Sequence, residues 1–181
     1  FSPQGSVGSI VSQQVGSSVL NDAVADDCSS EKSESAKPMS AKDLRLGAMS
    51  ILARREHSRK EVRDKLRQKF DPDTELLDAV LDQLVADDLL SDQRFSEAFV
   101  RWRVGKGQGP IRIRMELRER GIDGDAALGE CEVDWFALAA EVAHKRFGTS
   151  PVTDPKERAK RMRFLRYRGF NGEQIRSALN D

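Results

Sequence analysis

The residues whose types and spacing best suggest a chemical role are clustered arginines and lysines. Residues 54–69 hold eight basic and three acidic side chains, residues 101–120 hold seven and two, and residues 156–168 hold seven and one. Cations repeated along an edge can follow the phosphates of a nucleic acid, and such binding weakens strongly with salt. An acidic protein surface could bind them equally, so the clusters alone do not identify the partner.

One segment carries the opposite charge. Residues 71–92 contain eight acidic side chains and no basic one. Acidic side chains repel phosphate, so a protein that only binds DNA would tend to avoid such a segment. A protein that lies between DNA and another protein could use both signs of charge.

Catalytic chemistry finds little support in the residues. The glycine-rich segment 105–109 lacks the spacing of a phosphate-binding P-loop, and no buried strand precedes it, so we interpret it as a turn between helices. Its amides could still touch a backbone phosphate. Neither His57 nor His144 has a nucleophile and an orienting group at a recognisable spacing. We therefore expect no enzyme activity and no catalytic residue.

Metal, disulfide and membrane signals are also missing from the sequence. Cys28 and Cys131 lie far apart, and with two histidines they form neither a zinc-site spacing nor a disulfide framework. We expect reduced thiols, no metal and no cofactor. No apolar run approaches the ~20 residues that span a bilayer, and the first residues do not resemble a signal peptide. These patterns predict a cytoplasmic protein with no membrane partner.

Composition indicates helices with several small cores. Of the 181 residues, 33% are charged and only 6% are aromatic, which disfavours one large aromatic core. Residues 1–38 differ from the rest because they are rich in Ser, Gly, Val and Gln. We interpret them as a disordered extension, or as residues added by cloning or by a mis-assigned start, since Met39 could itself initiate.

Helical periodicity begins near residue 41 and continues to the end of the chain. Ser58 and Glu61 form a capping-box pattern, Ser91 caps a helix, and Asn171 with Gln174 caps the last one. Further helices are predicted around the apolar positions of 41–52, 76–85, 110–121, 135–147 and 155–169.

The helices repeat in groups. The pattern apolar-Arg-x-x-Leu occurs at 62–66, 113–117 and 175–179, each time four residues after a cap-like residue. We therefore predict an all-α fold of tandem three-helix repeats that forms an elongated, curved, solenoid-like molecule. The predicted repeats cover 39–90, 91–149 and 150–181, and the last one lacks an evident third helix.

Two aromatic residues lie among arginines and could stack on bases. Trp102 follows Phe95 by seven residues, so the spacing favours a core position for it. For Tyr167 the sequence leaves both roles open.

Several segments resemble the RecX family of regulatory proteins. These are LARREHSRKEVRDKL at 52–66, LLSDQRFSEAFVR at 89–101, KGQGPIRIR at 106–114, ELRERGI at 116–122, FLRYRGF at 164–170 and IRSAL at 175–179. They are distributed between residues 52 and 179, and the central block is the most specific. The extension at 1–38 matches no part of the family pattern.

The resemblance implies a partner and an activity. It implies three tandem three-helix repeats that bind the RecA recombinase filament on single-stranded DNA, in the filament's helical groove, with duplex DNA as a further partner. Inhibition of ATP hydrolysis, strand exchange and coprotease activity would follow, and with it modulation of DNA repair and the SOS response. We expect a monomer with no cofactor.

The contact surface predicted from charge and resemblance is the set of basic helix junctions. Charge reversal at two of its members, Arg112 and Arg114, should weaken filament binding and leave helicity intact. The predicted filament- and DNA-binding residues are Arg54, Arg55, Arg59, Arg63, Arg101, Arg103, Lys106, Arg112, Arg114, Arg118, Arg163, Arg166 and Arg168.

Two alternatives remain open at this stage. A helix-turn-helix DNA-binding regulator also has three-helix units, but it usually presents one recognition helix per protomer rather than three basic junctions. A helical protein-interaction scaffold would bind partners without DNA. Sequence-specific binding to duplex DNA would favour the first, and binding that ignores DNA would favour the second.

Overall fold

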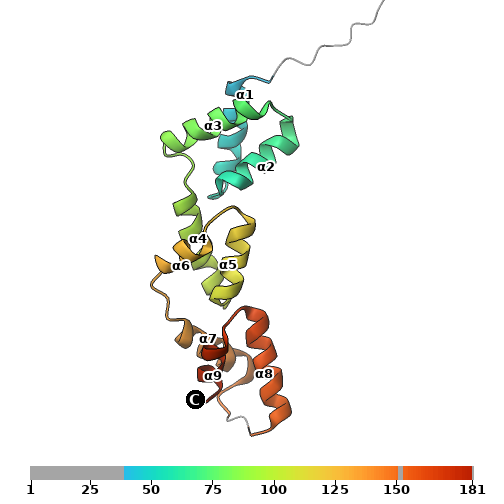
Figure 1. Cartoon of the computed structure of the whole chain (residues 1–181), viewed down its shortest axis with the longest axis vertical. Helices are drawn as coiled ribbons and strands as arrows, with labels where there is room; N and C mark the ends of the chain where they lie inside the picture. Colours follow the sequence, from blue (N-terminus) through green and yellow to red (C-terminus); the bar gives the residue numbers. More distant parts are fainter. Residues whose placement is uncertain (1–38, 151–152, 181) are drawn as a thin grey trace, which may run out of the picture. The chain divides into compact units, whose positions relative to one another are not determined.

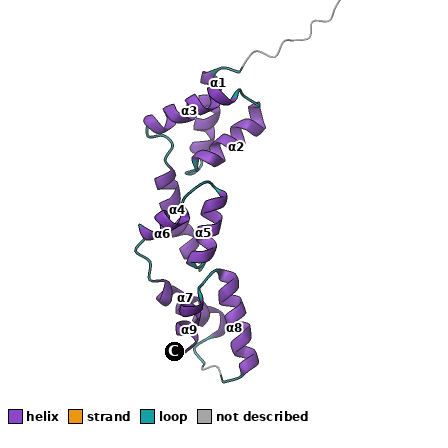
Figure 2. Ribbon diagram, viewed as in Figure 1, coloured by secondary structure: helices purple, strands orange, loops and turns teal. Residues whose placement is uncertain are grey.

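The computed structural model of the chain describes residues 39–150 and 153–180, and every regular element within these two segments is an α-helix (Figures 1 and 2). The all-α prediction is therefore confirmed. The interpretation of 1–38 and of Cys28 lies outside the described residues. The helices are α1 (Ala41–Leu52), α2 (Arg59–Phe70), α3 (Thr74–Ala86), α4 (Asp92–Gly105), α5 (Pro110–Glu119), α6 (Gly124–Gly129), α7 (Trp135–Phe147), α8 (Pro155–Arg168) and α9 (Gly172–Asn180).

Each successive group of three helices encloses its own small core. Leu44, Leu66 and Leu81 bring together α1, α2 and α3. The second core is built in the same way from α4, α5 and α6, and the third from α7, α8 and α9. The predicted tandem three-helix repeats are therefore present.

Local capping interactions determine where the helices begin. The Ser91 hydroxyl accepts a hydrogen bond from the Arg94 amide at 3.3 Å. Asn171 and Gln174 exchange reciprocal backbone–side-chain hydrogen bonds, both of 2.8 Å. Both caps occur where the sequence predicts them, because a cap involves residues only three apart in the chain.

The cap at Ser58 is only half of the predicted capping box. The Ser58 hydroxyl accepts from the Glu61 amide at 3.1 Å, as expected. The Glu61 carboxylate, however, does not return to the cap. It pairs instead with the guanidinium groups of Arg55 and Arg120.

The structure corrects the predicted division between the second and third repeats. Ala139 and Ala143 of α7 pack in the third core with Leu165 of α8 and Ile175 of α9, and only Trp135 at the start of α7 packs against the second core, where the sequence placed the whole helix. The short helix α6, which sequence reasoning missed, completes the second repeat. The third repeat therefore has three helices, and the expectation that it lacks one is wrong.

The predicted alignment of the third repeat must also be corrected. Val62 and Ile113 lie on the middle helices of their repeats, α2 and α5, whereas Ile175 lies on α9, the last helix of its repeat. The middle helix of the third repeat is α8. The match at 175–179 is therefore a coincidence of a common helical pattern.

Neighbouring repeats are joined between the ends of their middle helices. The Ser58 hydroxyl at the start of α2 donates to the carbonyl of Arg120 at the end of α5, at 2.8 Å. At the next junction the amides of Gly109 and Ile111 donate to the carbonyls of Arg168 and Gly169, at 2.9 and 3.0 Å. A helix N-terminus thus meets a helix C-terminus at both junctions, which is the favourable orientation of the two helix dipoles.

Candidate nucleic-acid interface

The thirteen predicted basic residues separate into two groups. Seven have internal partners: six pair with carboxylates, and the Arg168 guanidinium donates to the Lys106 carbonyl at 2.8 Å. Within the segments that the structure describes, the side chains of the other six form no hydrogen bond or ion pair, and all six are exposed. These six, the unpaired cations, are Arg54, Arg101, Lys106, Arg118, Arg163 and Arg166.

The acidic segment 71–92 supplies two of these internal partners and also partners for arginines outside the predicted set. Asp78 and Asp82 of α3 pair with Arg63 and Arg59 of α2, at 2.7 and 2.6 Å. Asp87 pairs with Arg45 of α1 at 2.7 Å. Much of this negative charge therefore stabilises the first repeat, and the pairing neutralises cations on α2 that the sequence suggested for phosphate binding.

The second repeat also pairs predicted cations with carboxylates of its own helices. Glu116 of α5 receives both Arg103 and Arg112, and the side chains of Arg103 and Glu116 are only 17% and 12% exposed. Arg114 pairs with Asp125 at the start of α6, at 2.7 Å. Charge reversal at Arg112 and Arg114 would therefore disturb packing as well as any partner contact, so the unpaired cations are better sites for testing binding.

The glycine-rich segment is a turn whose amides are already used. The amides of Gly107 and Gln108 donate to the carbonyls of Val104 and Arg103, at 2.8 and 3.1 Å. The Gly109 amide donates to the third repeat, as described above. These three amides are therefore not available to a phosphate, and this part of the segment fits an inter-helix turn rather than an anion site.

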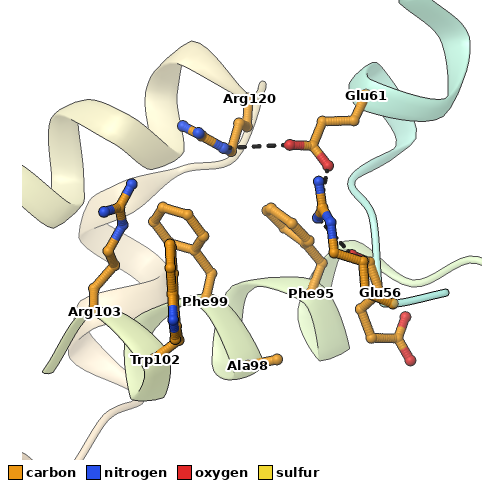
Figure 3. A pocket seen from close by; sticks show the side chains of 9 residues that line it. Glu56, Glu61, Phe95, Ala98, Phe99, Trp102, Arg103 and Arg120 are labelled. Atoms are coloured by element: carbon orange, nitrogen blue, oxygen red, sulfur yellow. Dashed lines mark hydrogen bonds and ion pairs between the residues drawn. The ribbon is translucent and has the colours of Figure 1, made fainter. Parts of the chain in front are cut away.

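A cleft of about 470 Å³ lies where the first repeat meets the second (Figure 3). Phe95, Ala98, Phe99 and Trp102 line it from α4, and Figure 3 shows these side chains along one side of it. On the opposite side, Glu61 and Arg120 form an ion pair of 3.3 Å (Figure 3). Arg55 also lines the cleft and pairs with the same carboxylate at 3.2 Å.

The aromatic rings of this cleft are braced by guanidinium groups. Arg103 lies over the rings of Phe99 and Trp102, at 5.0 and 4.4 Å from their centroids, and Arg120 lies over Phe99 at 4.8 Å. Phe99 is 8% exposed, whereas Trp102 is 53% exposed. The spacing argument that favoured a core position for Trp102 is therefore wrong in this respect: the indole rests against the core but half of it faces solvent.

His57 is buried at the same junction and is held in its neutral form. Its Nδ1 lies 2.9 Å from the Arg55 carbonyl and its Nε2 lies 2.7 Å from the Lys65 ammonium. Because a carbonyl only accepts, Nδ1 carries the proton and Nε2 accepts from Lys65. Burial lowers the pKa of His57 below its usual value near 6.5, and the neighbouring Arg55 and Lys65 charges lower it further.

This lowered pKa predicts a loss of stability in mild acid. Between the ordinary and the lowered pKa the unfolded chain binds a proton that the folded chain does not, so the free energy of unfolding should fall as the pH drops below about 6.5. Urea unfolding at about pH 7.5 and about pH 5.5 measures the effect. His57→Gln should show a smaller difference between the two conditions, and an unchanged difference would contradict the assignment.

Metal and membrane features are not found in the described part of the chain. Residues 39–150 and 153–180 contain no cluster of three or more His, Cys, Asp or Glu side chains that could hold a metal ion. No helix in these segments is long and apolar enough to span a membrane. Cys131 is a free thiol that donates to the Ala127 carbonyl at 3.1 Å, and burial raises its pKa.

Sequence comparisons identify all three repeats. Residues 48–84, 91–127 and 132–179 match family models described as the first, second and third three-helix domains of RecX. The chain belongs to the RecX family. The third match includes α7, in agreement with the core contacts of that helix and against the division predicted from the sequence.

RecX proteins of several bacteria are similar to this chain over most of their length. The regulatory protein RecX of Pseudomonas entomophila (strain L48) is 48% identical over 135 residues, which cover 73% of this chain and 86% of that protein. The regulatory protein RecX of Halorhodospira halophila (strain DSM 244 / SL1) is 45% identical over 139 residues, which cover 75% and 85%. These RecX relatives are named as regulatory proteins rather than as enzymes.

Solved RecX structures share the fold. The crystal structure of RecX from Lactobacillus salivarius superposes with a TM-score of 0.66 at 23% identity, over 77% of this chain and 94% of that one. A second crystal structure, of regulatory protein RecX, gives a TM-score of 0.62 at 23% identity, over 78% and 74%. At this identity the likeness supports the fold alone.

Proposed function

We propose that this chain binds the RecA recombinase filament on single-stranded DNA and inhibits its ATP hydrolysis, strand exchange and coprotease activity. Regulation of DNA repair and of the SOS response would follow from that inhibition. Membership of the RecX family, seen in all three repeats, is the observation that carries the proposal. The regulatory names of the relatives agree with it.

The unpaired cations give the proposal a physical basis. A guanidinium that already pairs with a carboxylate must lose that partner to bind a phosphate, whereas an unpaired one loses only water. Arg54, Arg118 and Arg163 lie in different repeats and are all exposed. We therefore assign phosphate or acidic-surface contacts to the unpaired cations first and a mainly structural role to the paired ones.

Filament binding can be tested by co-sedimentation. RecA filaments assembled on an oligonucleotide with a slowly hydrolysed ATP analogue should carry the full-length chain into the pellet. Arg54→Glu combined with Arg118→Glu should weaken this binding by about tenfold or more, because each change replaces an attraction by a repulsion. Lys42→Glu, which changes an exposed cation of α1 outside the predicted set, serves as the control.

Either of two outcomes would contradict the proposal. The folded wild-type chain would stay in the supernatant with filaments present, or the double variant and the Lys42→Glu control would bind equally well. Binding only to duplex DNA of a defined sequence would instead favour the helix-turn-helix regulator.

A further inference from the structure

Helix α8 presents a cationic face that takes no part in the core of the third repeat. Lys156, Lys160, Arg163 and Tyr167 follow one another at spacings of four, three and four residues, which places them on one side of a helix. All four are exposed, and Arg166 lies beside them. The opposite side carries Leu165, which is fully buried in the third core.

Charge pairing separates this face from the other cations of the same helix. Arg158 donates to the Asn180 side chain at 2.9 Å, and Arg161 pairs with Glu157 and lies over the Phe147 ring. Of the cations on the exposed face, only Lys160 has an ion-pair partner within residues 39–150 and 153–180, Glu157 at 3.2 Å. Among the described residues, Arg163 and Arg166 have none through their side chains. The face therefore retains a positive charge that nothing within these segments neutralises.

Tyr167 ends this face with an exposed aromatic ring. The side chain is 74% exposed, although a tyrosine that contributes to a core normally buries most of its ring. The Arg112 guanidinium lies over the ring at 5.3 Å from its centroid. Arg112 is itself fixed by Glu116 at 3.1 Å and by the Tyr167 carbonyl at 3.4 Å. Arg112 of α5 thus holds the Tyr167 ring in place, while most of the ring surface remains exposed to solvent.

A row of cations next to an exposed aromatic ring suits one class of ligand. Single-stranded nucleic acid has a phosphate for each nucleotide and bases whose faces can stack on aromatic side chains. The bases of a duplex are already stacked on each other, and an acidic peptide offers charge without a planar base. From Lys156 to Tyr167 the helix rises by about 16 Å, enough for several consecutive phosphates.

We propose that Lys156, Lys160, Arg163 and Arg166 of α8 bind backbone phosphates of single-stranded nucleic acid, and that Tyr167, supported by Arg112, stacks on one unpaired base. This inference rests on the proposed function, since it assigns the single-stranded contact of the regulator to the third repeat. It adds a stacking residue that the charge pattern alone could not identify.

Fluorescence anisotropy with the full-length chain and a labelled oligothymidylate, without recombinase, tests the stacking. Tyr167→Ala should weaken single-strand binding by about tenfold, the usual order for loss of one stacked base. Tyr167→Phe should bind like the wild type, because the ring is retained. Phe136→Ala, which removes a 47% exposed ring from α7 beside the acidic residues Glu132 and Asp134, should also have no effect.

Phosphate contacts and base stacking differ in their response to salt and to the form of the ligand. Arg163→Gln with Arg166→Gln should lower affinity for single strands and for duplex alike, and should reduce the slope of log affinity against log salt by about 0.7 for each lost single-strand contact. Tyr167→Ala should leave both the salt slope and the duplex affinity unchanged. On an oligonucleotide without bases, the wild type and Tyr167→Ala should bind equally.

Four results would overturn the inference. The folded wild-type chain would not bind single strands, or Tyr167→Ala would bind them as well as the wild type does. Alternatively, Tyr167→Ala would lose duplex binding to the same extent as single-strand binding, or the chain would bind polyglutamate as tightly as DNA.

Recombinase assays distinguish failure of this inference from failure of the proposed function. If the chain inhibits RecA but Tyr167→Ala binds and inhibits normally, only the stacking assignment fails. If the predicted DNA pattern holds but RecA is unaffected, only the proposed function fails.

Discussion

Replacing Gly109 with alanine should lower the free energy of unfolding by about 2–4 kcal/mol, the range of a change that breaks buried hydrogen bonds and forces backbone apart. An added Cβ would lie 2.5 Å from the Gly169 carbonyl carbon and oxygen and 2.6 Å from the Phe170 amide nitrogen. These are backbone atoms, so no side chain can rotate away. The two hydrogen bonds that join α5 to the end of α8 would have to lengthen or break.

Urea unfolding followed by circular dichroism measures the loss, and amide exchange locates it. The amides of Gly109 and Ile111 should exchange faster in Gly109→Ala, because their carbonyl partners in the third repeat move away. Gly105→Ala is the matched control: the added Cβ meets nothing within 4 Å, and the residue ends α4. Its stability should match or slightly exceed the wild type. Equal stability of Gly109→Ala and Gly105→Ala would contradict the tight junction.

Phe99→Ala should be comparably damaging, with a loss of about 3–5 kcal/mol, as for other buried phenylalanines. The Phe99 ring packs against Phe95 with centroids 5.7 Å apart and against Trp102 at 6.1 Å. The guanidiniums of Arg103 and Arg120 also lie over it. Its removal would therefore open the second core, leave Arg120 without its aromatic contact and leave Arg103 with the Trp102 ring alone.

Trp102→Ala measures how much an exposed aromatic ring of the same cleft contributes to stability, for comparison with the buried ring of Phe99. The indole is half exposed, so its loss should lower the free energy of unfolding by about 1 kcal/mol or less, mainly through its contact with Arg103. Chemical denaturation of both variants under the same conditions gives the comparison. A larger loss for Trp102→Ala than for Phe99→Ala would contradict the arrangement of the rings.

The parts of the fold that depend on near neighbours could be predicted from sequence. Caps at Ser91 and Asn171 involve residues three apart, and the apolar periodicity of α3 and α4 is strong enough to identify each helix. Helix α6 was missed because its six residues are too few to show a period.

The core to which a helix belongs was harder to predict. The apolar face of α7 shows that the helix packs, but periodicity does not say against what. Without α6, the periodicity gives the second repeat only two helices before α7. Only the contacts of Ala139 and Ala143 with α8 and α9 decide the question.

The sequence predicted the residue types of the candidate site but not which of its cations form ion pairs with carboxylates. Arg63 pairs with Asp78, Arg120 with Glu61, and Arg114 with Asp125, partners that the fold brings together from different helices. Charge counts along the chain cannot show which cations are neutralised in this way. The exposure of Tyr167 was equally open, since helical spacing places its ring on a face without saying what covers that face.

The most direct test of the central proposal is RecA's single-stranded-DNA-dependent ATP hydrolysis, titrated with the full-length chain at two salt concentrations. We expect inhibition that rises with dose, is reached with fewer copies of the chain than of RecA, and weakens at the higher salt because cation–phosphate contacts contribute to binding. If the rate of hydrolysis stays unchanged at both salt concentrations while circular dichroism shows the chain to be folded, the chain does not restrain RecA in this way.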